Sequence, residues 1–258
     1  MPETGVSFQN SLDSHKETPD IMNSLELLAL SPPGWGGFLL HGLATSMIIA
    51  FGGYFFGLAI GVAGAFGKLY GGPVVQDLLA CYTTIIRGVP ELVLIVLLYY
   101  AGTDIVNHVL MFIGAPPVNI SGMSAGISVI GVVQGAYSTE VLRGAIKAIP
   151  PGQVEAGRAY GMGPLLLLRR ITLPAMMPYA IPGLANLWLI ATKDTALLAV
   201  VGFTELTMAT RQAGGATKAY FLFFFTAGLL YFGVTLISNA VIRVIERRAY
   251  AGMPDVGK

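Results

Sequence analysis

Three long stretches of this 258-residue chain contain no fully charged side chain. They cover residues 27–67, 171–192 and 219–242, and an α-helix needs only about 20 apolar residues to cross the hydrocarbon core of a bilayer. Across the chain, 54% of the residues are hydrophobic and 11% are charged, whereas about a quarter of an average soluble domain is charged. A membrane β-barrel would instead show short segments of alternating polarity. We therefore expect an all-α, polytopic membrane protein.

Prolines, glycines and charged residues divide the chain into five predicted transmembrane helices. These cover about residues 38–66, 82–101, 124–146, 177–203 and 220–242. Pro90 predicts a kink in the second span, and Pro178 and Pro182 predict a bend in the fourth, because proline removes a helical hydrogen bond. Residues 102–122 are expected to form a loop with room for a short helix. The predicted organisation is an N-terminal extension (1–37), a transmembrane domain (38–248) and a short tail (249–258).

Lysine and arginine are unevenly distributed between the two sides that these spans define. If the polar loop 147–174 is cytoplasmic, that side carries eleven of them: Lys68, Arg87, Arg143, Lys147, Arg158, Arg169, Arg170, Arg243, Arg247, Arg248 and Lys258. The opposite side carries Lys16, Arg211 and Lys218. Cytoplasmic loops of membrane proteins are enriched in lysine and arginine. We therefore expect an external N-terminus and a cytoplasmic C-terminus.

A row of small residues runs along the first predicted span. Gly53, Gly57 and Gly61 are spaced by four, and Ala65 continues the row. Residues four apart lie on one face of a helix, and glycine there lets a neighbouring backbone approach closely. The row predicts a close helix–helix contact.

The loop 147–174 is the most polar stretch after the N-terminal segment. Pro151 suits the first turn of a helix, where its missing N–H is not needed. Glu155 is favoured near the N-terminus of that helix by the helix dipole. The following small residues would make the helix thin enough to enter a cleft on another protein; they are Ala156, Gly157, Ala159 and Gly161. A turn at Gly161 and Gly163 is expected before a second helix over residues 164–171.

The same loop carries a resemblance to a known family. It reads Glu-Ala-Gly, three residues, Gly, nine residues, Ile-x-Leu-Pro, and so resembles the coupling loop of ABC importer permeases, with Gly157 where the family usually has a second alanine. Segments 82–92, 135–144 and 193–198 are similar to the polar amino-acid branch of the type I permeases, closest to the histidine, lysine-arginine-ornithine and opine (octopine, nopaline) transporters. The resemblance covers about residues 38–250. It implies that the ATPase-coupling residues are Glu155, Ala156, Gly157, Ala159, Gly161, Ile171, Leu173 and Pro174.

The resemblance also implies partners and a location. Such a permease pairs with a second permease subunit, identical or homologous, with two cytosolic ATPase subunits and with a periplasmic solute-binding protein, in the bacterial inner membrane. This chain lacks a phosphate loop of its own: around Gly67-Lys68, Val62 stands where the first glycine is needed and Leu69 where Ser or Thr would reach Mg²⁺. We therefore expect no cofactor in this chain, with ATP and Mg²⁺ bound by the ATPases.

Several ionisable residues fall inside or near the ends of the predicted spans. Such groups usually face a cavity or a partner, because a charge at the bilayer centre is costly. The candidate substrate path consists of Glu91, Tyr137, Glu140, Lys193 and Asp194. We expect Lys193 to pair with Glu140, and structural salt bridges are the alternative role for the whole set. With Glu205, four carboxylates stand against one lysine, which favours a cationic amino acid or an arginine-derived opine as substrate.

Composition argues against several other functions. Fifteen basic residues against fourteen acidic ones do not make a nucleic-acid-binding surface. The single cysteine and three scattered histidines (His15, His41 and His108) show no metal-ligand spacing, and no catalytic motif is present. A secondary transporter or channel subunit for small polar solutes remains the alternative, although we find no inverted repeat of the kind common in such carriers.

Overall fold

The computed structural model describes residues 26–114, 116 and 121–250. Most of the expected N-terminal extension, 1–37, and of the expected tail, 249–258, therefore lies outside the described residues. The described part of the chain is helical and contains no strand. The all-α expectation is confirmed.

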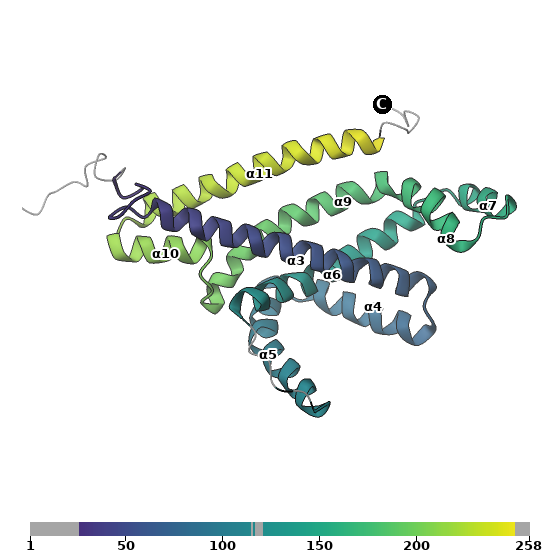
Figure 1. Ribbon diagram of the computed structural model, residues 1–258, viewed down its shortest axis with the longest axis horizontal. Coiled ribbons are helices and arrows are strands. Elements are labelled where there is room, and N and C mark those ends of the chain that lie inside the picture. Colours follow the sequence, from purple (N-terminus) through teal and green to yellow (C-terminus); the bar gives the residue numbers. More distant parts are fainter. Residues whose placement is uncertain (1–25, 115, 117–120, 251–258) are drawn as a thin grey trace, which may run out of the picture.

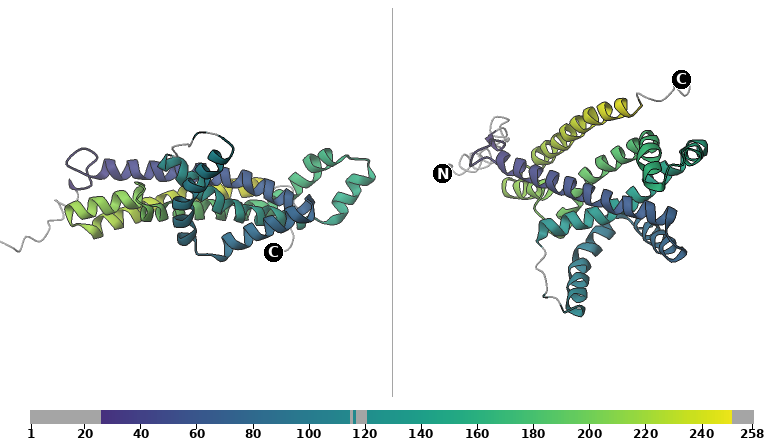
Figure 2. Two further views of the ribbon diagram at one scale, coloured as in Figure 1. Left: turned by 90° about the horizontal axis from the view of Figure 1, so that it is seen from below. Right: turned by 45° about the vertical axis from the view of Figure 1, so that its right-hand side comes forward.

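The helices follow one another with short connections, and the longest of them run roughly side by side (Figures 1 and 2). In chain order they are α3 (Gly36–Tyr70), α4 (Pro73–Gly88), α5 (Glu91–Phe112), α6 (Gly122–Lys147), α7 (Pro151–Ala159), α8 (Pro164–Leu167), a π-helical turn (Leu168–Thr172), α9 (Leu173–Asp194), a 3₁₀ segment (Thr195–Val201), α10 (Leu206–Thr217) and α11 (Tyr220–Tyr250).

Among the described residues, four helical stretches are long and apolar enough to cross a membrane: Gly36–Tyr70, Glu91–Phe112, Pro164–Val201 and Tyr220–Tyr250. The predicted third span corresponds to α6, which has 26 residues. This helix is more polar, with Gln134, Thr139 and Glu140 on it, and it packs along α3 in the middle of the molecule. The five predicted spans thus correspond to α3, α5, α6, α9 and α11.

The boundaries of the second span were predicted wrongly. Residues 82–101 are not one kinked helix, because α4 ends at Gly88 and α5 begins at Glu91. Val89 between them has extended backbone (φ −104°, ψ 140°), as expected for a residue whose α conformation is hindered by the following proline. The helix α5 then continues to Phe112, through most of the expected loop 102–122, and points away from α3 and α4 (Figure 1). The short helix α10 was also not predicted.

The glycine row on α3 makes the close contact that its spacing predicts. A Cβ atom added at Gly53, Gly57 or Gly61 would lie 2.3 to 2.8 Å from side-chain atoms of Ile130, Gln134 or Ser138 on α6. Because real Cβ atoms do not approach other atoms so closely, each of these positions requires glycine. The two helices approach along most of their length and form the centre of the structure.

A buried carboxylate joins three helices at the opposite end of α3 from the loop 147–174. Glu205 is fully buried at the N-cap of α10. It accepts hydrogen bonds from the backbone N–H groups of Thr207 and Met208, from the Ser46 hydroxyl on α3 and from the Tyr231 hydroxyl on α11. A buried carboxylate is tolerated when its oxygens are satisfied in this way. Glu205 therefore has a structural role.

We predict that Gly61→Val lowers the thermal stability of the protein, whereas Gly228→Val on α11 does not. Both sites are helical glycines, but nothing lies within 4 Å of a Cβ atom at Gly228, and a Cβ atom at Gly61 would be 2.3 Å from that of Ser138. Overpacking of this kind costs about 1–3 kcal/mol. The thermal midpoints of the two detergent-solubilised variants measure the difference, and equal midpoints would contradict the proposed contact.

Candidate functional site

The helix α7 begins and ends as its sequence predicts. Pro151 occupies its first turn. At its other end Gly161 adopts the left-handed conformation, with φ +74°. The N–H of Gly161 bonds to the carbonyl oxygen of Arg158 (2.9 Å), and the N–H of Met162 bonds to that of Gly157 (3.1 Å). These two bonds form a Schellman motif, in which glycine is strongly preferred at the left-handed position. Gly161 thus sets the direction in which the chain leaves α7.

Gly157 does not lie on the exposed face of α7, where the pattern of small residues placed it. It is buried, and an added Cβ atom would lie 2.5 Å from Cδ1 of Ile171 and 2.6 Å from Cδ1 of Leu167. Glycine at this position lets α7 pack tightly on the segment that leads into α9. The physical reason for the small residue is therefore contact within the chain itself.

The remaining loop residues of the predicted set are distributed between an exposed face and this internal contact. Glu155, Ala156 and Ala159 are exposed on α7, so the loop presents a narrow face with one carboxylate. Ile171 is half-buried against Gly157, and Leu173 and Pro174 are exposed at the start of α9. The loop is thus a compact helical hairpin that another protein can contact from outside.

On its C-terminal side the hairpin continues into the bundle as one helical run. The π turn follows α8 directly and leads into α9 without a break, so the helix continues from Pro164 to Val201. At its near end this run carries Leu167 and Ile171, which contact α7. Near its far end it carries Asp194, which is 6% exposed.

Three residues of the predicted substrate path lie close to one another: Glu91, Tyr137 and Asp194. The Glu91 carboxylate, in the first turn of α5, lies within interaction range of both the Asp194 carboxylate and the Tyr137 hydroxyl. The Arg87 guanidinium lies over the Tyr137 ring, 5.9 Å from its centroid. Two neighbouring carboxylates repel each other unless a proton or a cation lies between them. This group, here called the acidic cluster, consists of Glu91, Tyr137 and Asp194.

Gln134 is a fourth member of the acidic cluster, and the sequence did not predict it. It is fully buried, and its Nε2 donates to Oδ2 of Asp194 (3.3 Å). Within the described residues its Oε1 atom has no hydrogen-bond partner, and neither has the Ser138 hydroxyl one turn further along α6. Buried polar atoms without partners are rare. The cluster therefore contains buried polar atoms that no described residue satisfies.

The expected pairing of Lys193 with Glu140 is wrong. Lys193 is exposed, while Glu140 pairs with Lys68 on α3 (2.6 Å) and with Arg143 one turn along α6 (2.6 Å). The Lys68 ammonium also donates to the Thr83 hydroxyl on α4 (2.8 Å). Glu140 thus binds α3, α4 and α6 together, which is the structural role that the sequence left open as the alternative. These side chains line an open polar pocket of about 410 Å³.

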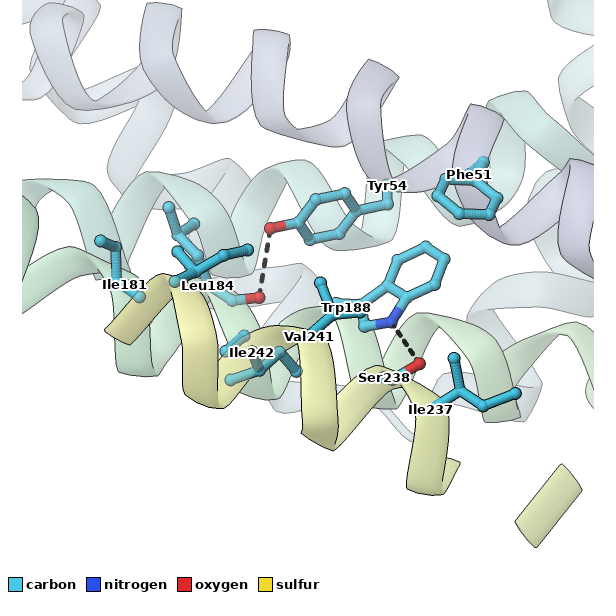
Figure 3. Close-up of a pocket in the computed structure, with 11 residues that line it drawn as sticks. Phe51, Tyr54, Ile181, Leu184, Trp188, Ile237, Ser238, Val241 and Ile242 are labelled. Atoms are coloured by element: carbon cyan, nitrogen blue, oxygen red, sulfur yellow. Dashed lines mark hydrogen bonds between the residues drawn. The ribbon is translucent and has the colours of Figure 1, made fainter. Parts of the chain in front are cut away.

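An apolar pocket of about 380 Å³ lies between α3, α9 and α11 (Figure 3). Two hydrogen bonds cross its edge: the Trp188 indole N–H donates to the Ser238 hydroxyl on α11 (3.0 Å), and the Tyr54 hydroxyl donates to the Leu184 carbonyl oxygen (3.2 Å). The remaining lining is mostly aliphatic.

The described residues include no group of three or more His, Cys, Asp or Glu side chains that could hold a metal ion.

Residues 53–250 match the family described as the binding-protein-dependent transport system inner membrane component. The chain belongs to this family. The permeases in it are transport proteins of the membrane and not enzymes. The family assignment agrees with the helical fold and with the hairpin that projects from the bundle.

Several relatives align with this chain over most of its length and over almost all of their own. The octopine transport system permease protein OccQ of Rhizobium radiobacter is 40% identical over 233 residues, which are 90% of this chain and 98% of that protein. The histidine/lysine/arginine/ornithine transport system permease protein HisQ of Salmonella typhimurium is 39% identical over 220 residues, with 85% and 96% coverage. The nopaline permease NocQ of Agrobacterium fabrum is 37% identical, with 89% and 98% coverage. The resemblance to the opine and basic amino-acid branch is confirmed.

Solved structures share the permease fold. A chain of an amino acid ABC transporter crystallised with histidines superposes with a TM-score of 0.71 at 28% identity, covering 83% of this chain and 95% of that one. A chain of the MetNI methionine ABC transporter gives a TM-score of 0.59 at 20% identity, with 81% and 96% coverage. The second likeness shows the fold alone. The predicted type I importer permease fold is confirmed.

We predict that Gly157→Val loosens α7, whereas Gly152→Val, in the same helix but with nothing within 4 Å of an added Cβ atom, does not. Valine has a higher helix propensity than glycine. Propensity alone would therefore stabilise the helix in the Gly157→Val variant. The added side chain would instead collide with Leu167 and Ile171. Amide hydrogen exchange over residues 151–161 should become faster in Gly157→Val only. Equal protection in both variants would show that Gly157 does not hold the hairpin together.

Proposed function

We propose that this chain is the membrane-spanning permease subunit of an ATP-driven, binding-protein-dependent importer for cationic amino acids or opines. The observation that carries the proposal is the Glu-Ala-Gly to Ile-x-Leu-Pro hairpin, folded as an exposed projection of a helical membrane bundle whose family is that of binding-protein-dependent permeases. The relatives named for octopine, nopaline and the basic amino acids support the substrate class.

The proposed assembly contains two permease subunits, identical or homologous, a pair of cytosolic ATPase subunits and a periplasmic solute-binding protein. ATP and Mg²⁺ bind to the ATPases. In the bacterial inner membrane the hairpin faces the cytoplasm, with the N-terminus periplasmic and the C-terminus cytoplasmic. The distribution of lysine and arginine, eleven on the hairpin side against three on the other, supports this orientation.

Coupling to the ATPases takes place through residues 155–161, at the C-terminal end of α7 and just beyond it, and through the segment that supports them. Glu155, Ala156 and Ala159 form the exposed surface that an ATPase cleft can accept. Gly157 and Gly161 act from within, since the first permits close packing on Ile171 and the second ends the helix. Because α7 packs on the helical run 164–201, a displacement of α7 is passed on to α9.

The acidic cluster is the proposed contact point for the substrate in the membrane. Glu91 and Asp194 supply negative charge, and Gln134 Oε1 and the Tyr137 hydroxyl supply further acceptors. A guanidinium or ammonium group placed among them would relieve the repulsion of the carboxylates and satisfy the free acceptor. Guanidinium groups can also pair with a carboxylate through two parallel hydrogen bonds.

The alternative function, a secondary transporter or channel subunit, uses no ATPase. It leaves the exposed small-residue face of α7 without a role, and it does not agree with the family. Uptake that continues when ATP is depleted but collapses with the proton gradient would favour it.

We predict that Ala159→Trp abolishes transport while the protein still inserts. The bulky side chain would keep the exposed face of α7 out of the ATPase cleft, so copurification of the ATPase subunits and ATP-dependent uptake should both fall. Tyr160→Trp is the matched control, because Tyr160 is 86% exposed and already large. Full uptake by the Ala159→Trp variant with normal assembly would remove the coupling assignment.

We predict that arginine, lysine, histidine and octopine compete for uptake, and that glutamate and glutamine do not. In the same assay Asp194→Asn should weaken uptake by about tenfold or more, as expected for the loss of a charged hydrogen-bond partner. Lys193→Gln, at the exposed neighbouring position, should transport normally. Strong inhibition by glutamate without inhibition by the cationic compounds would contradict the substrate class.

A further inference from the structure

Three prolines lie on one face of the first half of α9. Pro174, Pro178 and Pro182 are spaced by four residues, which places them one above the other on the helix. Proline has no backbone N–H, and its ring collides with the carbonyl group four residues earlier. Pro178 and Pro182 lie inside α9, so two i to i−4 hydrogen bonds are missing along this face, and the carbonyl oxygens that lose their donors belong to Pro174 and Pro178.

The chain responds to the first proline by winding more widely. The π turn Leu168–Thr172 directly precedes Pro174, and the N–H of Leu173 bonds to the carbonyl oxygen of Leu168, five residues back. This extra residue in the turn makes room where the ring of Pro174 would collide with Arg170. π-helical turns within α-helices occur frequently at functional sites.

The carbonyl group freed by the third proline receives a donor from a distant helix. The Tyr250 hydroxyl, at the end of α11, donates to the carbonyl oxygen of Pro178 (3.1 Å). In a membrane helix, a backbone carbonyl that loses its helical partner needs another donor. Tyr250 supplies that donor 72 residues further along the chain.

The position of this segment connects it to both parts of the candidate site. On one side lies the π turn with the residues that pack on α7, and on the other, after residue 182, lies the stretch of α9 that ends at Asp194. The apolar pocket of about 380 Å³ lies beside it, lined by Ile181 and Leu184 of α9 and by Val241 and Ile245 of α11. Beyond the pocket, the Trp188–Ser238 bond holds α9 and α11 together a second time.

We propose that residues 174–182 form a joint between the hairpin and the acidic cluster, and that Tyr250 is a positioning residue that sets its bend. Helices bend most easily where proline interrupts the hydrogen bonding, and the adjoining pocket lets the segment move without displacing packed side chains. Movement of α7 then reaches Asp194 as a change of bend, and α11 takes part through Tyr250. The role in coupling rests on the proposed function, whereas the hydrogen bond does not.

A double-mutant cycle with Pro182→Ala tests the inference. Alanine at 182 restores the N–H that Pro178 needs, so the Tyr250 hydroxyl becomes redundant. Tyr250→Phe alone should speed amide exchange over residues 175–186 by about two- to tenfold, the range expected for one net hydrogen bond, and should lower the solute taken up per ATP hydrolysed by the assembled transporter. Added to Pro182→Ala, Tyr250→Phe should change neither quantity. Tyr179→Phe is the control. It removes a tyrosine hydroxyl from α9, the helix that carries Pro178, at a position that is 44% exposed.

The outcomes separate the inference from the function on which it rests. Equal effects of Tyr250→Phe in both backgrounds would show that Tyr250 does not act through Pro178 and would overturn the inference. Faster exchange with unchanged uptake per ATP would reduce Tyr250 to a structural residue and would overturn the joint. Uptake by the native transporter that needs no ATP would overturn the proposed function, while the exchange measurements would still decide the role of the hydrogen bond.

Discussion

The close approach of α3 and α6 is the constraint on which the rest of the structure depends. Without side chains at Gly53, Gly57 and Gly61, the backbone of α3 lies against Ile130, Gln134 and Ser138. Gly57 contacts Gln134, whose amide group reaches Asp194 on α9. Further along the same contact, Lys68 at the end of α3 reaches Glu140. A wider separation of the two helices would break the Lys68–Glu140 ion pair and would remove the packing of α3 against Gln134, which holds Asp194.

The carboxylates within the bundle are of two kinds, which differ in how many hydrogen-bond donors and cations contact their oxygens. Glu205 accepts four hydrogen bonds, and Glu140 is paired with two cations. These two hold helices together. Asp194 is buried beside Glu91 and a glutamine whose Oε1 atom has no partner in the described chain. An unsatisfied polar group in an apolar setting is costly, and this incomplete satisfaction is the basis for proposing the cluster as the substrate contact.

The run from Pro164 to Val201 gives the permease a mechanical connection between its exterior hairpin and its interior. Its near end is held by α7 through Gly157, and its far end carries Asp194. A continuous helix transmits displacement well, but this one is interrupted by prolines where it enters the bundle. Two hydrogen bonds between this run and α11 limit how it can bend. Trp188 donates to Ser238 on α11, and Tyr250 on α11 donates to the carbonyl oxygen of Pro178. This arrangement is the basis of the proposed coupling between the hairpin and Asp194.

The sequence by itself determined what depends on neighbours along the chain. Uncharged length predicted membrane helices, four-residue spacing predicted the glycine contact, and Pro151 and Gly161 predicted the ends of α7, because each effect acts within one or two turns. Only the tertiary structure decided which distant residues meet. In the folded chain Glu140 pairs with Lys68 and not with Lys193, and Gly157 packs inside the hairpin. Gln134 bonds to Asp194 in the acidic cluster, and Tyr250 bonds to Pro178. Helical periodicity gives the direction of a side chain from its own axis, but how the helices cross decides what lies in that direction.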